Sequence, residues 1–254
     1  MSTMIVKMTA FMFSVILFAA PVHAAEMQSS AGEVLTTVVE GPAQVFTTGK
    51  QQPVSLKKGN RLKQDQEVRV GEKSRVELLF PDGTVMRLAG KSRLNIGEVI
   101  FDRKTEGKNV KVNLGSGKLW AKVKKLITPD SSVEVRTTNA VAGVRGTVYR
   151  VNVNDDNSAL VKVYDGSVYV ASPPADPSKP MGMVTAPVPV AGPHAIAPPV
   201  HEVSLEEWHV IVKSFQQVSI SPQGVASQPK DFDPKTDVDD WVTWNQERDK
   251  DVVL

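Results

Sequence analysis

Hydrophobic and polar residues alternate along much of the region 32–171, in short runs separated by turn residues. In the run 74–80 the apolar side chains fall on every second position, which is the period of a β-strand with one buried face. Asp82 and Gly83 follow, and a second alternating run covers 84–88. Because Asp-Gly between two such runs favours a tight turn, the pattern predicts a hairpin. The side chains predicted to face inward are Val76, Leu78, Phe80, Met86 and Leu88.

Turn residues recur at a spacing of roughly ten residues, which is typical of sandwiches, barrels and rolls. Two further strand pairs are predicted, 110–114 with 119–123 across Gly115-Ser116-Gly117, and 160–164 with 167–170 across Asp165-Gly166. Before residue 200 we find no long window with the 3.6-residue period of a helix. The predicted fold class is therefore all-β, a roll or sandwich of short antiparallel strands.

Two glycines three positions apart mark the segment 137–151. Gly143 and Gly146 enclose Val144 and Arg145, and an alternating run begins at Thr147. Glycines at this spacing usually supply a positive φ or allow another segment to approach closely. Since β-like runs flank them on both sides, the pattern favours a corner between strands over a phosphate-binding loop.

Arg145 has two interpretations. An arginine at a tight corner can form a bidentate pair with a carboxylate of the body and so fix the corner, or it can recognise a ligand. The structural role is the one we assign. The residues given this role are Gly143, Arg145, Gly146, Thr147, Gly117, Asp82 and Gly83.

The composition changes after Ala171. Nine of the 17 prolines lie between residues 172 and 199, which favours an extended segment, either a free linker or strands laid along the body. Beyond it, the Ser204-x-x-Glu207 pattern is typical of a helix start. The apolar residues that follow this pattern at helical spacing are Leu205, Trp208, Val212 and Phe215.

A second short helix is predicted from Val238 to about Lys250, begun by Asp237. It carries Trp241 and Trp244 one turn apart, so it either docks on the β body or waits for a partner. The chain is thus expected to comprise a signal peptide (1–24), a β domain (25–171), a Pro-rich extended segment (172–203) and a C-terminal helical, acidic extension (204–254).

The N-terminus has the pattern of a secretory signal peptide. Lys7 precedes an apolar run of 13 residues, 8–20, and small residues lead to a cleavage site after Ala24. The run is short for a bilayer span, which needs about 20 residues, so an uncleaved anchor is the less favoured alternative. We therefore expect a periplasmic or secreted protein of a Gram-negative bacterium, with no transmembrane segment after cleavage.

Composition narrows the chemistry. The chain has no cysteine, which excludes disulfides, thiol catalysis and thiolate metal sites. A formal net charge of +2 predicts no general affinity for nucleic acid. His194, His201 and His209 match no zinc spacing, and no nucleophile motif is present. We therefore expect no metal, no cofactor and no enzymatic activity, with an unrecognised hydrolase as the weakest alternative.

Basic residues are concentrated in the segment 103–125. Lys118 and Lys122 alternate there with Trp120, so this strand is a candidate contact for a ligand or partner. Trp120 is interpreted either as an exposed anchor or as a residue covered by the C-terminal segment. The lysines are interpreted either as a solvated or edge-strand feature or as a face for an anionic glycan. Trp241 and Trp244 complete the set of candidate contact residues.

The ordered motifs together resemble the FecR domain, the periplasmic module of ferric-citrate-type signalling regulators. The resemblance covers roughly residues 59–170. The segments that carry it are Gly59-Asn-Arg-Leu62, Ser74-Arg-Val-Glu-Leu78, Phe80-Pro-Asp-Gly-Thr-Val-Met-Arg-Leu88, Leu114-Gly-Ser-Gly-Lys-Leu-Trp-Ala-Lys-Val123, Val135-Arg-Thr137, Ala140-Val-Ala-Gly-Val-Arg-Gly-Thr147 and Tyr164-Asp-Gly-Ser-Val168.

The resemblance implies a protein-binding, scaffolding or signalling role in the periplasm, with an envelope protein as partner. Regulators of this type carry a cytoplasmic sigma-factor-binding segment and a membrane span ahead of the domain, whereas this chain has a predicted signal peptide there. We therefore expect a secreted form without those two parts. The alternative function is binding of peptidoglycan or an acidic polysaccharide through the basic strands at 104–125.

Overall fold

The computed structural model describes residues 32–101, 107–125, 131–173 and 209–252. Within them strands predominate, with 17 strands and one helix, α1 (Asp240–Asp251). The all-β prediction is therefore confirmed. The predicted signal peptide, most of the Pro-rich segment and the proposed helix start at Ser204 lie outside the described residues.

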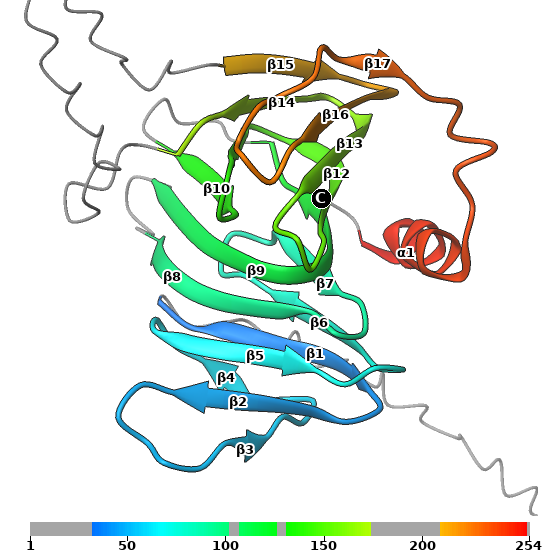
Figure 1. Ribbon diagram of the computed structural model, residues 1–254. Helices are drawn as coiled ribbons and strands as arrows, with labels where there is room; N and C mark the ends of the chain where they lie inside the picture. Colours follow the sequence, from blue (N-terminus) through cyan, green and yellow to red (C-terminus); the bar gives the residue numbers. More distant parts are fainter. Residues whose placement is uncertain (1–31, 102–106, 126–130, 174–208, 253–254) are drawn as a thin grey trace, which may run out of the picture.

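The strands form two layers, which we call sheet A and sheet B. In Figure 1 the strands follow one another from β3 at the bottom to β15 at the top, and α1 lies on one side. Sheet A contains, in spatial order, β4 (Arg61–Leu62), β1 (Val34–Glu40), β6 (Arg75–Leu79), β7 (Val85–Leu88), the second half of β9 (Lys108–Val123), β12 (Thr147–Val153), β13 (Ala159–Asp165), β16 (Gln216–Ile220) and β17 (Lys230–Asp231).

Sheet B has the same number of members. In spatial order they are β3 (Val54–Ser55), β2 (Ala43–Thr47), β5 (Gln66–Val70), β8 (Arg93–Phe101), the first half of β9, β10 (Ser132–Arg136), β11 (Val141–Val144), β14 (Ser167–Ala171) and β15 (His209–Lys213). The pairs are antiparallel except β9 with β10, which is parallel.

One hydrophobic core lies between the two layers. It is built from the inward-facing alternate residues of both sheets, as period-two patterning requires. The five side chains predicted to face inward in the first hairpin are all buried in it. β6 and β7 form the hairpin predicted across Asp82 and Gly83, with Val76 opposite Leu88.

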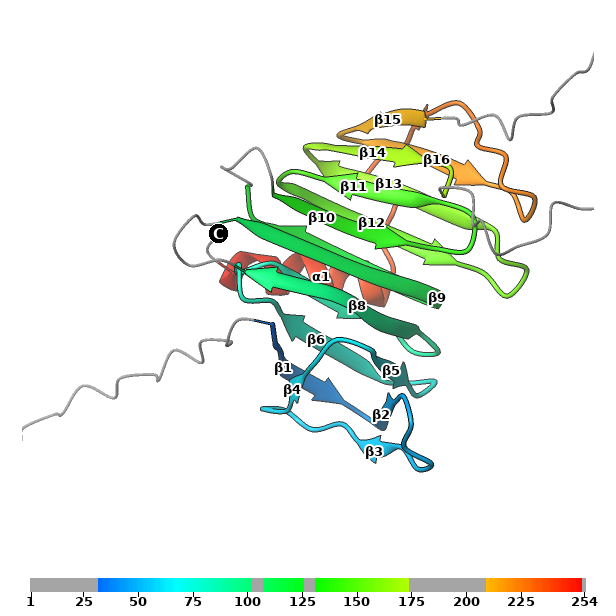
Figure 2. The ribbon, with the colours of Figure 1, turned by 90° about the vertical axis from the view of Figure 1, so that its left-hand side faces the viewer.

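The longest strand, β9, joins the two layers, as Figure 2 shows across the middle of the molecule. Its residues 108–116 pair with β8 in sheet B, and its residues 117–123 pair with β12 in sheet A. The predicted hairpin across Gly115-Ser116-Gly117 is therefore wrong. Gly117 has a φ of +91° and bends a continuous strand from one layer into the other instead of reversing it.

The predicted hairpin across Asp165-Gly166 is also wrong. β13 belongs to sheet A, where it pairs with β12 and β16, whereas β14 belongs to sheet B, where it pairs with β11 and β15. The chain changes layer at this turn. An Asp-Gly pair marks the turn correctly but does not say whether the two strands stay in one sheet.

The first of the two predicted C-terminal helices is not found in the described residues. Residues 209–213 form β15 and 216–220 form β16, each extending one sheet. The β-branched residues of this stretch alternate around buried Val212 and Val218, and pairing with β14 and β13 outweighs the helical spacing of the apolar residues. The second predicted helix is α1, which begins two residues later than expected and is capped by Asp239.

Candidate functional site

The two sheets have different outer faces. α1 lies against the outer face of sheet A, and the outer face of sheet B carries a groove. The sequence-predicted contact residues Trp120, Lys118 and Lys122 all lie on the half of β9 that belongs to sheet A. Trp241 and Trp244 lie on α1, so the structure brings all five to one interface.

The face beneath α1 is a row of polar and aromatic side chains across neighbouring strands. The Cα register places Glu77 opposite Arg87, Arg87 opposite Trp120, Trp120 opposite Arg150, and Arg150 opposite Lys162. Alternation sets this row, because the intervening residues of each strand enter the core. Side chains that sequence patterning assigns to solvent therefore meet each other under a helix.

Trp120 is covered by the C-terminal segment. It is 1% exposed and packs with Trp241 and Val242 of α1. Its indole Nε1 donates to Asp249 Oδ2 at 3.0 Å, and its ring lies 4.5 Å from that of Tyr164. While α1 is docked, Trp120 offers no surface to a partner.

Four charged side chains form the first cluster at this interface. Glu77 accepts from Arg87 Nε at 2.7 Å and, through both oxygens, from Arg248 of α1 at 2.8 and 2.9 Å. Arg87 is fully buried and also pairs with Asp249 at 2.5 Å. Burial alone would raise the pKa of Glu77, but hydrogen bonds from Arg248, Arg87 and Thr37 outweigh it and lower the pKa to about 2. Glu77 therefore stays ionised between Arg87 of the sheet and Arg248 of the helix.

Asp237 is the centre of a second cluster, which lies on β12 and β13, beyond β9. It accepts from Arg150 Nη2 at 2.8 Å, from Lys162 Nζ at 2.9 Å and from the Tyr164 hydroxyl at 2.6 Å. Burial would raise the pKa of Asp237, but the bonds from Tyr164 and Lys162 and the charge of Arg150 lower it. Burial and the bond to Asp237 raise the pKa of Tyr164. Asp237 thus anchors the chain just before α1 instead of starting the helix.

The basic residues of β9 do not form one open cationic face. Lys122 Nζ donates to the backbone oxygens of Asp249 and Val252 at 2.6 and 2.7 Å, which satisfies the last turn of α1. Lys118 lies 3.6 Å from Asp239, and Lys111 lies on sheet B. Lys111 pairs there with Glu98 at 2.7 Å.

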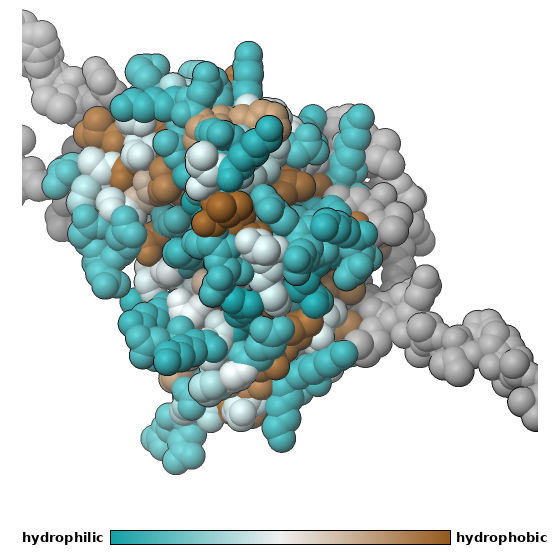
Figure 3. Space-filling model, turned by 90° about the vertical axis from the view of Figure 1, so that its right-hand side faces the viewer, coloured by the Kyte–Doolittle hydropathy of each residue, from teal (hydrophilic) through white to brown (hydrophobic). Residues whose placement is uncertain are grey.

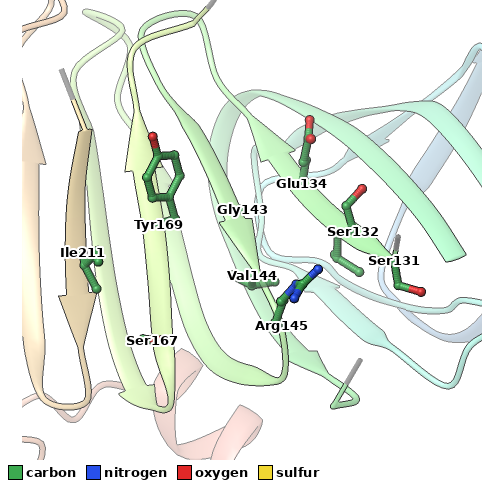
Figure 4. Close-up of a pocket in the computed structure, with 10 residues that line it drawn as sticks. Ser131, Ser132, Glu134, Gly143, Val144, Arg145, Ser167, Tyr169 and Ile211 are labelled. Atoms are coloured by element: carbon green, nitrogen blue, oxygen red, sulfur yellow. The ribbon is translucent and has the colours of Figure 1, made fainter. Parts of the chain in front are cut away.

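The groove on sheet B has a volume of about 440 Å³ (Figure 4). Its floor is a second cross-strand row, in which Glu134 lies opposite Gly143, Gly143 opposite Tyr169, and Tyr169 opposite Ile211. Tyr169 and Ile211 are 48% and 56% exposed. The other residues that line it are Ser131, Ser132, Val133, Val144, Arg145 and Ser167.

Gly143 leaves the centre of this row without a side chain. Its φ is not positive, and a Cβ placed there would have no closer neighbour than the Tyr169 carbonyl oxygen at 3.9 Å. Neither backbone strain nor crowding therefore requires glycine at 143, contrary to the expectation for this glycine. Its structural consequence is the space between Glu134 and Tyr169.

Gly146 has the conformation that the corner needs. Its φ is +95°, and a Cβ there would lie 2.7 Å from the Cα of Lys125. The chain passes at this point from β11 in sheet B to β12 in sheet A, and Thr147 Oγ1 donates to the Ser167 carbonyl at 3.0 Å. Arg145 lies at the end of β11 beside the groove (Figure 4). Its assigned role of fixing the corner stays a prediction.

Comparison with known families identifies the β body. The model of a family described as "FecR protein" matches residues 66–169. This chain contains a FecR domain. The matched range includes Arg87, Trp120, Gly143 and Tyr169, whereas α1 and β15, which complete the two outer faces, lie outside it.

Two solved structures, each a candidate anti-sigma factor from Parabacteroides distasonis, are similar to about two thirds of the chain. The first has 17% identity and a TM-score of 0.46, and the match covers 71% of this chain and 64% of the other. The second has 16% identity and a TM-score of 0.44, with 66% and 61% covered. The match therefore spans less than two thirds of either structure. No curated protein matches the chain.

Sequence reasoning missed the residues that hold α1 in place. Glu77 and Arg87 follow from the predicted hairpin as a cross-strand pair, but their burial depends on a helix more than 150 positions away. Asp249 gives no sequence signal among the many acidic residues. Tyr169 was detectable as the outward position between buried Val168 and Val170, yet its exposure alone did not distinguish it.

Two further observations concern the described part of the chain. Histidines and carboxylates nowhere gather into a group that could hold a metal ion. Among the same residues, no helix has the length and the apolar character needed to cross a membrane.

Proposed function

We propose that this chain is an exported, non-enzymatic FecR-domain protein that binds another protein in the periplasm of a Gram-negative bacterium and takes part in signalling. The observation that carries the proposal is the FecR domain at residues 66–169, since this family is regulatory. The predicted signal peptide supports export. The role of anti-sigma factor given to the two similar structures belongs to those proteins alone.

The groove on sheet B is the surface we assign to the partner. It combines the exposed Tyr169 and Ile211 with the polar side chains of Arg145 and Glu134, a mixture that suits protein interfaces. β15 lies beside it and, within the described residues, pairs only with β14, so its outer edge has unpaired backbone groups there. An extended segment of a partner could form main-chain hydrogen bonds with the edge of β15 and place an apolar side chain against the groove.

Filling the groove tests this assignment. Gly143→Leu places a side chain in its centre without backbone strain. Gly115→Leu is the matched control, because Gly115 is also a strand glycine with an open Cβ position. Each protein is used to capture partners from envelope extract of the source bacterium. We expect wild type and Gly115→Leu to retain the same protein and Gly143→Leu to lose it at least tenfold. Equal capture by both variants would reject the groove.

Export is tested separately. We expect the mature protein to be recovered from the periplasmic fraction with Ala25 as its first residue. Recovery from the cytoplasm with Met1 retained would contradict the proposal. The peptidoglycan and acidic-polysaccharide alternative is not favoured, since three lysines of the basic strands, Lys111, Lys118 and Lys122, already have partners within the chain.

A further inference from the structure

α1 is held to sheet A mainly by polar side chains. Of its twelve residues only Trp241, Val242 and Asn245 are buried. Long polar side chains make further contacts from both sides. Arg87 and Lys122 reach from the strands to Asp249 and to the last backbone carbonyls, and Arg248 reaches from the helix to Glu77. Figure 3 shows that the molecule is mostly hydrophilic on the α1 side, with small hydrophobic areas between.

This interface leaves several polar atoms unsatisfied. Among the described residues, eight buried side-chain nitrogen or oxygen atoms have no hydrogen-bond partner. Four of them lie between α1 and sheet A, namely Arg87 Nη2, Arg150 Nε, Trp241 Nε1 and Asn245 Oδ1. None of these atoms has a partner within the protein in the docked state, and the desolvation of the buried charges offsets part of what their pairing contributes. The docked state is therefore less favourable than its many contacts suggest, which makes release of α1 accessible.

Release would expose a surface with a definite character. Five cations, Arg87, Lys118, Lys122, Arg150 and Lys162, would surround Trp120 and Tyr164, with Glu77 as the carboxylate among them. The segment that now covers this surface has the opposite charge. Residues 237–251 contain six acidic and two basic side chains and two tryptophans.

We propose that this face of sheet A is a second protein-binding surface, whose occupant is an acidic helical segment bearing tryptophan, presented by a partner protein. α1 is the intramolecular copy of that segment and occupies the surface until a partner replaces it. The proposal is independent of the groove on sheet B, which lies on the other sheet. Its basis is charge complementarity together with the contacts that α1 itself makes.

The covalent link between α1 and the sheet determines how tightly a partner segment must bind to replace α1. A segment attached by a short linker competes at an effective concentration in the millimolar range. The connection from β17 to α1 is residues 232–239, so α1 is tethered in this way. A partner segment with the same contacts therefore binds wild type poorly. It binds well when the contacts of α1 are weakened while the sheet surface stays intact.

The test uses the full chain and a synthetic peptide of residues 232–252 with a fluorescent label at its N-terminus. The double variant Asp237→Asn, Asp249→Asn weakens α1 without altering the sheet, and Glu247→Gln is the control on the exposed side of the helix. Binding is measured by fluorescence anisotropy, and docking of α1 by hydrogen exchange of its backbone amides.

We expect the double variant to lose protection in α1 at least tenfold and to bind the peptide at least 100-fold more tightly than wild type or Glu247→Gln. A peptide with both aspartates replaced by asparagine should not bind. The proposal is overturned if α1 is released and the peptide still fails to bind, or if α1 keeps its protection in the double variant. A concentration-dependent dimer of the double variant would overturn the separate partner and make a second copy the occupant. Gly143→Leu should leave peptide binding unchanged, which separates this result from the groove.

Discussion

Replacing Glu77 by glutamine perturbs the α1 interface at a residue that joins the helix to the sheet. Glu77 accepts hydrogen bonds from Arg87 on the neighbouring strand and from Arg248 on the helix, so its charge joins the two. Glutamine keeps the size of the side chain and removes the charge. Arg87, which is fully buried, then keeps Asp249 as its only carboxylate.

The lowered pKa gives the magnitude. The pKa of Glu77 falls from its ordinary value of 4.5 to about 2 in the folded protein. Each pKa unit corresponds to about 1.4 kcal/mol, so ionised Glu77 contributes about 3 kcal/mol to the free energy of unfolding. Since the folded pKa is the lower one, this contribution is complete above about pH 4.5. It is lost as the pH falls towards 2, because the unfolded chain binds the proton first.

The assay is urea unfolding at a series of pH values, with Glu247→Gln as control. At pH 7 we expect Glu77→Gln to lower the free energy of unfolding by about 3 kcal/mol, and Glu247→Gln to change it by less than about 0.5 kcal/mol. Between pH 4.5 and 2 the curves of wild type and Glu77→Gln should converge. A difference that stays constant down to pH 2 would refute the electrostatic explanation and leave a packing effect.

Three further experiments test particular elements of the fold. Gly146→Ala should destabilise by about 1–3 kcal/mol in urea unfolding because of its positive φ, whereas Gly115→Ala should be neutral or slightly stabilising. Val212→Ala should cost about 2 kcal/mol, while Phe215→Gly should cost nothing, since Phe215 is exposed with a φ of +64°; equal losses would favour a helix here. Lys122→Met should raise amide exchange in the last turn of α1 and leave its first turn unchanged.

Alternation predicted the strands and their buried faces well, because burial on one side of a sheet is a local property of the sequence. It did not predict which strands share a layer. β9 contains three turn-like residues, Gly115-Ser116-Gly117, yet it continues as one strand. Whether glycines reverse a strand or bend it depends on the neighbours available on both sides, and β8 and β12 lie too far apart in the sequence to be seen together.

The first predicted C-terminal helix, whose apolar residues run from Leu205 to Phe215, was wrong for a related reason. Its spacing of apolar residues suits one face of a helix, but β-branched residues pair well on an open sheet edge, and β14 offers such an edge to β15. α1 was predictable because no sheet edge competes for its residues and because Asp239 caps its N-terminus. A local pattern decides the element only where no sheet edge competes for it.

The residues of the candidate site likewise include some that a local pattern predicts and some that it does not. Trp120 and its neighbouring lysines were identified from one strand, and Trp241 and Trp244 from one helix, but their meeting depends on the ion pairs of Asp237 and Asp249. These carboxylates have no distinctive neighbours in the sequence. They can be recognised as the anchoring carboxylates only when the sheet register has brought cations from distant strands into one row.

The cross-strand rows also explain why the two outer faces differ. Both sheets place charged side chains in register, but sheet A gathers cations around Trp120. In sheet B, Lys111 pairs with Glu98 and Arg136 pairs with Glu134, so the charges balance before the row reaches Gly143. An unbalanced row needs an acidic cover, and α1 is that cover. A balanced row needs none, so its far end with Tyr169 remains exposed. Contact with the intact chain is therefore expected on sheet B, and contact on sheet A requires that α1 leave first.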